Sequence, residues 1–597
     1  MNNHFYKDRS PEETIHKIRT ILKENNIVVT ENTWYNKSNH YCSLTLGVEN
    51  TPFSVNGKGV TPLYALASAY GELMERIQNL AIYKLMYNNI AKECIDENEF
   101  MFAPDEECIN KKEFFQMQNL WLKEQLESVR TNKDDLNNLW LRTSMSQDSD
   151  HYVCLPYYCV NTSKVYAIPV VMLAKMYATN GMAAGNTLEE AMVQGLSEIY
   201  ERYAIKTIIK NKITPGDIPR NEIYKDNLLK DMIERIEQTS RYTLYIKDCS
   251  TNLNLPVVAV ICVDQNNGYY FVKFGSHPVF SIALQRTLTE LLQGQNLHEI
   301  RGMSPFEHNE AISCSNENIY QIFLNGCGTY PSEFFKDNPN YSLDAFKDAE
   351  VLSNKDMLKN MFNDLKSRGF NILVRDVSFL EFPACQIIIP TISEVEDYDN
   401  AVSLNRYINY LDLKIQIENV DNLLKQDLVN LADTIYNKEN LRFIPPESWL
   451  NLKQDNIPWV YKNTYFLVAS LYILADDYVN ASKTFAEFLN IFAGSISEQE
   501  SYYFRCASSL LSMLSDKIDL TTIKDILGKF YNTNVIDFAV NDFSKENIYS
   551  VFENIKLKEN NTKLNELKTL YLKICDGYRR NVIYQGDLKK LFDDLEV

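Results

Sequence analysis

Residues Asn180–Arg202 read NGMAAGNTLEEAMVQGLSEIYER, a glycine-rich turn that opens a helix ending in ExxER. Polar residues recur in this segment at steps of four, four, four and three. Because an α-helix repeats every 3.6 residues, such steps form one polar stripe over about four turns. The stripe consists of Asn186, Glu190, Gln194, Glu198 and Glu201.

A solvated helix face explains many polar stripes, but the neighbours of this one are small, as at Gly185 and Gly195, and the opposite face is apolar. The helix is therefore predicted to be buried on most sides. Burying a carboxylate costs several kcal/mol unless cations compensate it. Mg²⁺ prefers hard oxygen ligands and bridges carboxylates to phosphates, so the stripe indicates a magnesium site. Thr187 and Glu190 also fit a capping box, with Asn186 as an alternative cap.

A second segment, Asn56–Arg76, reads NGKGVTPLYALASAYGELMER and is interpreted as a glycine-bearing turn leading into another helix. Glu72, Glu75 and Arg76 stand at i, i+3 and i+4 and share one face of that helix. Taken alone, this pattern favours an exposed helix end with an ion pair. Its similarity to Asn180–Arg202 favours a shared site instead.

The third segment, Ser276–Gln293, reads SHPVFSIALQRTLTELLQ and places Arg286, Glu290 and Gln293 at i, i+4 and i+7. Arg286 suits phosphate oxygens, because its planar fork matches them and stays charged. The alternative is an intrahelical pair between Arg286 and Glu290. His277 precedes a proline and is interpreted as a packed turn residue outside the catalytic set.

Composition limits the classes of partner. The chain has 597 residues and a formal charge of -19, which opposes direct binding of nucleic acid. Its twelve cysteines are scattered without a CxxC spacing, as expected of buried reduced thiols. The start, Met1–Ser10, is polar and no apolar run reaches the length of a membrane span. We therefore expect a cytoplasmic protein that does not bind membranes.

The chain is predicted to form two domains. Strand-like runs alternate with helices up to about residue 400: YVCLPYYCV, VYAIPVVMLA, LPVVAVICVD, GYYFVKFG, NILVR and CQIII. This pattern predicts an α+β catalytic domain over residues 1–400. Residues 401–597 have helical periodicity and are predicted to form an all-helical domain. Spacings between Tyr465 and Phe488 resemble one tetratricopeptide repeat, and an ordinary helical hairpin fits equally. Either favours a protein partner or a homodimer.

Common nucleotide and hydrolase motifs are missing from the sequence. It contains no GxxxxGK[ST] loop, dinucleotide fingerprint, HExxH or GxSxG. In NGKGVT, Gly59 stands where a phosphate loop requires Ser or Thr. Any nucleotide site must therefore use another fold.

The three segments together resemble the YcaO superfamily, above all the pairing of NGMAAGNTLEEAMVQGLSEIYER with ALQRTLTELLQ. The resemblance covers residues 1–400, and the helical C-terminal part is similar to that of the long stand-alone members. It implies an ATP and Mg²⁺ site in which ATP, converted to ADP and phosphate, activates a peptide backbone amide oxygen by phosphorylation. A nucleophile then attacks. The long branch is an accessory factor for β-methylthiolation of a small-subunit ribosomal protein.

The resemblance also implies roles for individual residues. Glu201 and Arg286 would be catalytic. The implied magnesium ligands are Glu72, Glu75, Glu198, Glu201 and Glu290. The implied ATP-binding residues are Lys7, Thr14, Asn186, Glu190, Gln194, Arg202 and Arg286.

The sequence departs from the family pattern in three places. Leu63 stands where a lysine is expected, and Ala183 replaces a serine before the AGN triplet. The chain ends LFDDLEV, without the PxPxP tail of azoline-forming members. Without the lysine, one phosphate contact is absent or supplied elsewhere. The missing tail ranks azoline synthesis below the other functions considered.

Three functions follow as hypotheses. The first is an ATP- and Mg²⁺-dependent enzyme that activates an amide in a peptide or protein such as a ribosomal protein, with a partner enzyme supplying the nucleophile or sulfur. The second is a nucleotide-binding adaptor with slow ATP turnover, which recruits a partner through its helical domain. The third is an azoline-forming peptide cyclodehydratase.

Overall fold

The chain forms two compact units in a computed structural model, and each unit is described by itself. The first comprises Met1–Ser403 and Leu567–Val597, and the second comprises Leu404–Glu566. The residues that the structure describes are 7–37, 40–51, 53–80, 100, 102–117, 151–251, 256–297, 300, 302–339, 352–395, 413–438, 441, 445–446, 450, 458–492, 497–553 and 562–597.

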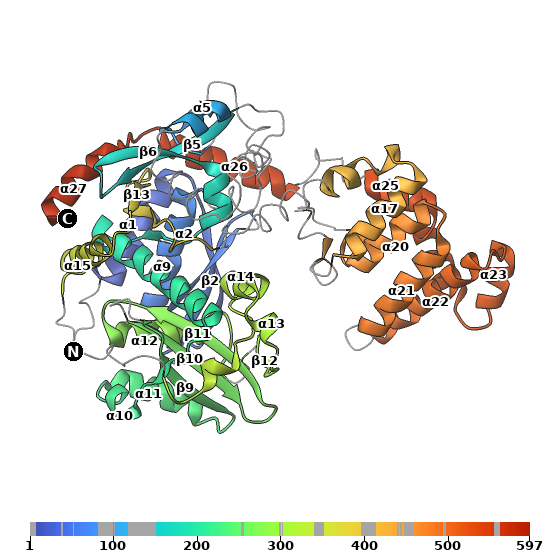
Figure 1. Cartoon of the computed structure of the whole chain (residues 1–597), viewed down its shortest axis with the longest axis horizontal. Helices are drawn as coiled ribbons and strands as arrows, with labels where there is room; N and C mark the ends of the chain where they lie inside the picture. The colour runs from blue at the N-terminus through green and yellow to red at the C-terminus, as the bar shows by residue number, and fades with distance from the viewer. Residues whose placement is uncertain are drawn as a thin grey trace. The chain divides into compact units, whose positions relative to one another are not determined.

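The described residues of the first unit form three antiparallel sheets (Figure 1). The three-stranded sheet has the order β1 (Val29–Tyr35), β2 (Cys42–Val48), β3 (Ser54–Gly59). The five-stranded sheet has the order β12 (Ser304–Pro305), β11 (Tyr269–Ser276), β10 (Val257–Asp264), β9 (Tyr242–Asp248), β8 (Gly216–Asp217). The six-stranded sheet has the order β4 (Glu107–Asn110), β5 (His151–Cys159), β13 (Leu373–Asp376), β14 (Ala384–Ile388), β7 (Met182–Ala184), and β6 (Lys164–Pro169) pairs with β5.

These sheets, with the helices on them, confirm a mixed helix-and-sheet fold, and the six predicted strand runs coincide with β5, β6, β10, β11, β13 and β14. One run was predicted too long. VYAIPVVMLA leaves the sheet at Pro169, and the next residues form a short helix, Val170–Met172, and a π-helical turn, Leu173–Tyr177. Proline has no N–H to donate to a ladder, which explains the end of the strand.

Helices pack on the faces of these sheets. α9 (Leu188–Lys210) contacts β14 and β7 of one sheet and β11 of another, so it lies between them. α2 (Pro62–Gln78) packs on β3, and α12 (Phe280–Leu291) packs on β10 and β11. The other helices of this unit are α1 (Pro11–Glu24), α5 (Lys111–Gln116), α10 (Arg220–Ile223), α11 (Asn227–Glu237), α13 (Glu310–Ser313), α14 (Asn316–Asn325), α15 (Asn354–Ser367) and α27 (Leu588–Leu595), together with most of α26 (Thr562–Tyr578) and a 3₁₀ turn at Ser332–Phe335.

The segment NGKG is part of β3 and not the turn that the sequence predicted. Its glycines are required by packing. A Cβ at Gly57 would lie 2.1 Å from the backbone oxygen of Ala65, because α2 folds back directly onto the strand. The glycine pair therefore reports a close approach of helix and strand, which the sequence pattern does not distinguish from a turn.

Residues 567–597 belong to the first unit, although the sequence placed them in the helical domain. Their aromatic side chains account for this. Tyr578 is fully buried, stacks on Phe379 with ring centroids 4.7 Å apart, and donates a hydrogen bond of 2.7 Å to the carbonyl of Ile77. Phe592 stacks on Tyr158 at 5.6 Å. The C-terminal segment therefore completes the core of the α+β unit.

The second unit is helical throughout its described residues. Its helices are α17 (Lys425–Tyr436), α20 (Thr464–Leu474), α21 (Tyr478–Phe492), α22 (Glu498–Ser515), α23 (Leu520–Leu527), α24 (Thr533–Asp542) and α25 (Lys545–Glu553), with 3₁₀ turns at Val420–Asn422 and Trp459–Tyr461. Phe466 and Phe488 lie in its core, with their ring centroids 4.5 Å apart. The predicted helical region is confirmed, and its tetratricopeptide-like character stays a prediction.

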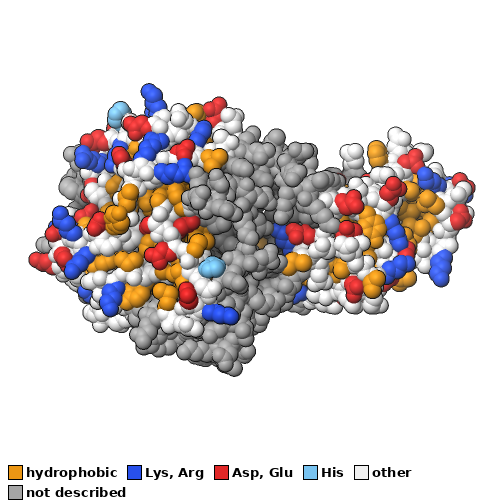
Figure 2. All heavy atoms as spheres, turned by 90° about the horizontal axis from the view of Figure 1, so that it is seen from above, with side chains coloured by type: hydrophobic (Ala, Val, Ile, Leu, Met, Phe, Trp, Pro, Cys, Tyr) orange, Lys and Arg blue, Asp and Glu red, His pale blue; other side chains and the backbone are white. Residues whose placement is uncertain are grey.

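In the described residues, no helix is both long enough and apolar enough to cross a membrane. On the face in Figure 2, acidic, basic and hydrophobic side chains of the described residues are interspersed, so the basic side chains there form no continuous patch.

Candidate functional site

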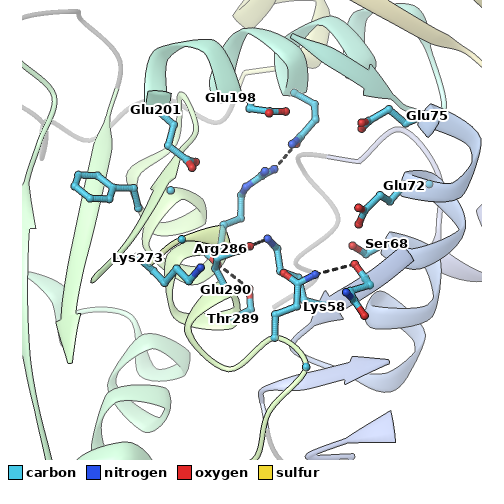
Figure 3. A pocket seen from close by; sticks show the side chains of 18 of the residues that line it. Lys58, Ser68, Glu72, Glu75, Glu198, Glu201, Lys273, Arg286, Thr289 and Glu290 are labelled. Carbon is cyan, nitrogen blue, oxygen red and sulfur yellow. Dashed lines mark hydrogen bonds and ion pairs between the residues drawn. The ribbon is translucent and has the colours of Figure 1, made fainter. Parts of the chain in front are cut away.

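A cavity of about 850 Å³ opens in the first unit between α1, α2, α9, β11 and α12. All twelve residues that the sequence singled out as ligands of metal or nucleotide line it, so the structure brings them together. They are Lys7, Thr14, Glu72, Glu75, Asn186, Glu190, Gln194, Glu198, Glu201, Arg202, Arg286 and Glu290. Figure 3 shows glutamates of α2 and α9 facing the cavity from two sides, with Arg286 between them.

The polar stripe of α9 faces this cavity, while the rest of the helix is buried in apolar contacts. Ala191, Leu196 and Ile199 are fully buried, whereas Glu198 and Glu201 line the cavity. The stripe is therefore the wall of a cavity inside the fold and not a solvated helix face.

The N-terminal residues close one end of the cavity through a hydrogen-bond network on Glu190, which is only 4% exposed. One Glu190 oxygen lies 3.0 Å from the Lys7 ammonium, and the other accepts the backbone N–H of Asp8 at 2.9 Å. Asn186 donates to the same carboxylate at 3.0 Å and accepts the hydroxyl of Thr14 at 2.8 Å. We call these five residues the paired end.

This network settles the capping alternatives. Thr187 is the N-cap of α9, since its hydroxyl accepts the N–H of Glu190 at 3.1 Å. The Glu190 carboxylate points to Lys7 instead of returning to the cap. Burial raises the pKa of Glu190, but Lys7 and the N–H of Asp8 outweigh burial and hold it below its usual value.

Two arginines pair with glutamates of α2 and α9 that line the cavity. Arg76 lies 3.5 Å from Glu75 and 3.9 Å from Glu72 on α2. Arg202 lies 3.0 Å from Glu198 on α9. The ion pair expected of an exposed helix end is thus present on α2, but it lines the cavity.

Several of these carboxylates are incompletely compensated. Burial raises the pKa of Glu75 to about 8, although Arg76 acts to lower it. Burial also raises the pKa of Glu201 to about 7, although Arg286 acts to lower it. Burial, opposed by Arg76, likewise raises the pKa of Glu72. A divalent cation would stabilise the charged forms, so this donor set fits Mg²⁺.

The residues of α12 find partners on other elements. Glu290 pairs with Lys58 of β3, and Arg286 donates a hydrogen bond to Gln194 of α9. Among the described residues, the intrahelical pair between Arg286 and Glu290 is not formed. His277 is 3% exposed, and its Nδ1 accepts the N–H of Val279 at 3.0 Å, in keeping with a packed turn residue.

Sequence reasoning missed two lysines that line the cavity, Lys58 and Lys273. Leu63, which replaces an expected lysine, is 44% exposed and lies outside the cavity, so these two side chains supply positive charge from other positions. Lys273 could have been found from the sequence, since it is the one charged residue in the apolar strand β11. Lys58 lay between two glycines of a strand that was interpreted as a turn.

The charges in the cavity are nearly balanced. Six glutamates and seven lysine or arginine residues line it, and most form ion pairs with each other or with residues nearby. Among its described residues, three charged groups have no partner of opposite charge within ion-pair distance: Glu201, Arg286 and Lys273. We call these three residues the unpaired side.

The cavity does not contain a closed metal cage. Within the described residues, no three acidic, histidine or cysteine side chains converge closely enough to hold a metal ion. Mg²⁺ commonly takes one or two carboxylates together with phosphate oxygens and water. The separated glutamates therefore fit magnesium that is bound together with a polyphosphate.

The family model described as YcaO cyclodehydratase, ATP- and Mg²⁺-binding, matches residues 56–393. This chain belongs to the YcaO family. The resemblance seen in the sequence is thereby confirmed, and so are ATP and Mg²⁺ as the cofactors that the family binds.

Two relatives share much of the chain. An uncharacterized protein of Haemophilus influenzae is 30% identical over 403 residues, which cover 67% of each chain. The ribosomal protein S12 methylthiotransferase accessory factor YcaO of Escherichia coli is 25% identical over 516 residues, covering 86% of this chain and 87% of that protein. The similarity therefore extends into the helical second unit.

Two solved structures resemble part of this chain at low identity. YcaO from Methanopyrus kandleri, bound with AMPPCP and Mg²⁺, is 17% identical with a TM-score of 0.41 and covers 65% of this chain and 93% of that chain. A heterocyclase in complex with substrate and cofactor is 17% identical with a TM-score of 0.43, covering 65% of this chain and 53% of the heterocyclase.

Proposed function

We propose that this YcaO protein uses ATP and Mg²⁺ to phosphorylate a backbone amide oxygen of a peptide or protein. The observation that supports this most is the cavity itself, in which glutamates of α2, α9 and α12 face each other around Arg286. Such a site offers oxygen ligands for metal and cations for phosphate in one enclosed volume. Phosphoryl transfer depends mostly on that kind of positioning and charge stabilisation.

The proposal gives each predicted residue a role. Magnesium, when bound, neutralises charge on the phosphate oxygens. Its proposed ligands are Glu72, Glu75, Glu198, Glu201 and Glu290. The proposed ATP contacts are Lys7, Thr14, Asn186, Glu190, Gln194, Arg202 and Arg286. Glu201 and Arg286 act at the reacting centre, because neither is committed to an ion pair in the described residues.

In the proposed transfer, a lone pair of the amide oxygen forms a bond to the γ-phosphorus, and the bond from that phosphorus to the bridging oxygen breaks. The electron pair of the broken bond stays on ADP, and the amide nitrogen loses its proton to water. A nucleophile then loses its proton to water and attacks the activated carbon, which moves the electrons of the C=N bond to nitrogen. Those electrons re-form the double bond as the C–O bond breaks, and the electron pair of the C–O bond leaves with phosphate.

The existing ion pairs prepare the cavity for a charged ligand. Arg76 and Arg202 occupy carboxylates that the proposal assigns to magnesium, and Lys58 does the same at Glu290. On binding, the carboxylates can turn to metal and the cations to phosphate without exposing an uncompensated charge. The site is thus arranged for a metal–nucleotide complex more than for either alone.

The E. coli relative indicates a biological setting. It is a ribosomal protein S12 methylthiotransferase accessory factor and aligns with 86% of this chain. We therefore extend the proposal to an accessory role in β-methylthiolation of a ribosomal protein, with a partner enzyme supplying the sulfur. Comparing the modified peptides of cells with and without this protein would identify both substrate and product.

Replacing Glu201 with Gln tests the enzymatic role. We expect ATP turnover to fall by about 10²-fold or more, because the change removes a charged ligand at the reacting centre. Glu189→Gln is the matched control, since Glu189 lies on the same helix outside the cavity. If Glu201→Gln hydrolysed ATP as fast as the parent, the proposal would be wrong.

A second candidate is a nucleotide-binding adaptor with slow turnover. The second unit exposes Phe530 and Phe538 by 70% and 62%, and its α20–α21 pair matches the tetratricopeptide-like spacing. ATP-dependent capture of a partner by the full chain, unchanged in Glu201→Gln, would favour this function. Rapid ADP release stimulated by a peptide would exclude it.

The family description also keeps azoline formation as an alternative outcome of amide activation. In that reaction a neighbouring Cys, Ser or Thr side chain of the substrate is the nucleophile. Mass spectrometry of a treated peptide would show the loss of one water. A peptide that instead gains sulfur in the presence of a partner enzyme would favour the accessory role.

A further inference from the structure

Lys273 is a cavity residue to which neither the family resemblance nor the sequence pattern gives a role. It is the one charged residue of β11, and its side chain points into the cavity across from α2 (Figure 3). Its ammonium lies 4.9 Å from the centre of the Phe271 ring. In the described part of the chain it has no carboxylate within ion-pair distance.

The ammonium lies directly against Gly326. A Cβ at Gly326 would lie 2.1 Å from Nζ of Lys273. Gly326 has φ 73° and caps the C-terminus of α14. A helix C-terminus carries partial negative charge and favours a cation beside it. The helix therefore holds Lys273 without neutralising it.

The surroundings of Lys273 differ from those of the other cavity cations. Lys7, Lys58, Arg76 and Arg202 each form an ion pair with a glutamate of the cavity. An anion that enters the cavity can therefore meet Lys273 and Arg286 without breaking an ion pair. Lys273 and Arg286 are therefore available to bind the phosphoryl group, whose charge changes in the reaction.

Beside Lys273, the cavity wall becomes apolar. Phe271, Ile322, Phe323 and Tyr330 line this part. Tyr330 is 3% exposed, and its hydroxyl has no hydrogen-bond partner among the described residues. An apolar wall with an unpaired hydroxyl suits a peptide segment better than a triphosphate. Lys273 therefore lies between the part of the cavity that suits a peptide and the part that suits ATP.

We infer that Lys273 binds the transferring phosphoryl group on the side that faces the peptide acceptor. This inference rests on the proposed function. In the transfer, the ammonium neutralises negative charge on the phosphoryl oxygens while the amide oxygen approaches. Without the ammonium, the phosphoryl oxygens and the amide oxygen would repel each other. When the nucleophile later displaces phosphate, the same ammonium stabilises the leaving group.

Lys273→Met tests the inference because methionine keeps much of the aliphatic stem and removes the charge. The probes are MgADP alone and MgADP with aluminium fluoride, which mimics the transferring phosphoryl group. We expect the parent to bind the second complex at least about 10²-fold more tightly, as transition-state analogues do. Lys273→Met should bind MgADP with unchanged affinity and lose about tenfold or more of that gain. Lys336→Met, which removes an exposed lysine outside the cavity, should match the parent.

The outcomes separate the inference from the proposed function. If the parent bound neither complex, the proposed function would fail. If the parent bound both and Lys273→Met kept the full gain, only the role of Lys273 would fail. Equal loss of both complexes together with a lower Tm would mean a structural role and would also overturn the inference. A fall in kcat for ATP hydrolysis with unchanged KM would support it.

Discussion

The paired end and the unpaired side of the cavity each include a glutamate of α9 but differ in how their charges are satisfied. At the paired end, Glu190 accepts hydrogen bonds from Lys7, Asp8 and Asn186. On the unpaired side, Glu201 and Arg286 find no partner of opposite charge in the described residues. The difference separates a binding function from a chemical one, because preformed networks hold a ligand whereas uncompensated groups are available to a changing charge.

Arg286→Met should break this comparison with the largest effect. An arginine that stabilises charge in phosphoryl transfer contributes about 10³-fold or more to kcat. We expect ATP turnover to fall by about that factor, with MgADP affinity changed by less than about tenfold. Steady-state hydrolysis and ADP titration measure the two quantities. A larger loss in ADP affinity than in kcat would place Arg286 in binding instead.

Glu190→Gln should have a smaller and different effect. It leaves the side-chain shape but removes the charge that holds Lys7, so we expect KM for ATP to rise about tenfold while kcat changes little. Saturation curves for the variant and the parent would show it. A lower kcat at unchanged KM would end the distinction between the two parts of the cavity.

The pH dependence of stability offers a sharper distinction between Glu75 and Glu190. The pKa of Glu75 is raised to about 8 in the folded protein, so between pH 4.5 and 8 the folded state binds a proton that the unfolded state has lost. The contribution of Glu75 to the free energy of unfolding is therefore present at low pH and is lost as the pH rises through 8. The lowered pKa of Glu190 gives a contribution that is constant across this window.

Urea denaturation without Mg²⁺ and nucleotide would measure this difference between pH 5.5 and 8.5. We expect the parent to lose stability with rising pH relative to Glu75→Gln. The difference between the parent and Glu190→Gln should stay level. The groups facing Glu75 are Arg76, Glu72, Glu198 and Arg202. A level Glu75→Gln difference would show that its carboxyl is already ionised.

The smallest expected effect concerns α2 outside the cavity. Tyr578→Phe removes a hydrogen bond to the carbonyl of Ile77 at the end of α2 and should cost about 1 kcal/mol of unfolding free energy. Tyr461→Phe in the second unit is the control, because its buried hydroxyl has no partner among the described residues and its removal should cost nothing. Equal costs would mean that the C-terminal segment does not hold α2.

The residues of the site that could be predicted from the sequence lie on helices. Helical periodicity alone placed Glu190, Gln194, Glu198 and Glu201 on one face, because that face depends on local geometry. Burial of the face followed from the small residues beside it. ATP and the amide substrate came from the family resemblance, since periodicity carries no information on the ligand.

The remaining features depend on contacts between distant parts of the chain. Lys58 and Lys273 reach the cavity from strands, and the pairing of those strands decides which side chains face it. NGKG was interpreted as a turn because the sequence does not reveal how closely α2 approaches Gly57. Tyr578 belongs to a helical pattern, and only its partners, more than 190 residues earlier, assign it to the first unit.

The interrupted first unit also orders events during synthesis. The ribosome makes Leu404–Glu566 before the residues that complete the α+β core, a delay of roughly 10 to 30 s at usual elongation rates. During that time Tyr158 and Phe379 lack their aromatic partners from the C-terminal segment. The nascent chain therefore already contains every glutamate of the cavity while its core is incomplete. It needs protection from aggregation until α27 has left the ribosome.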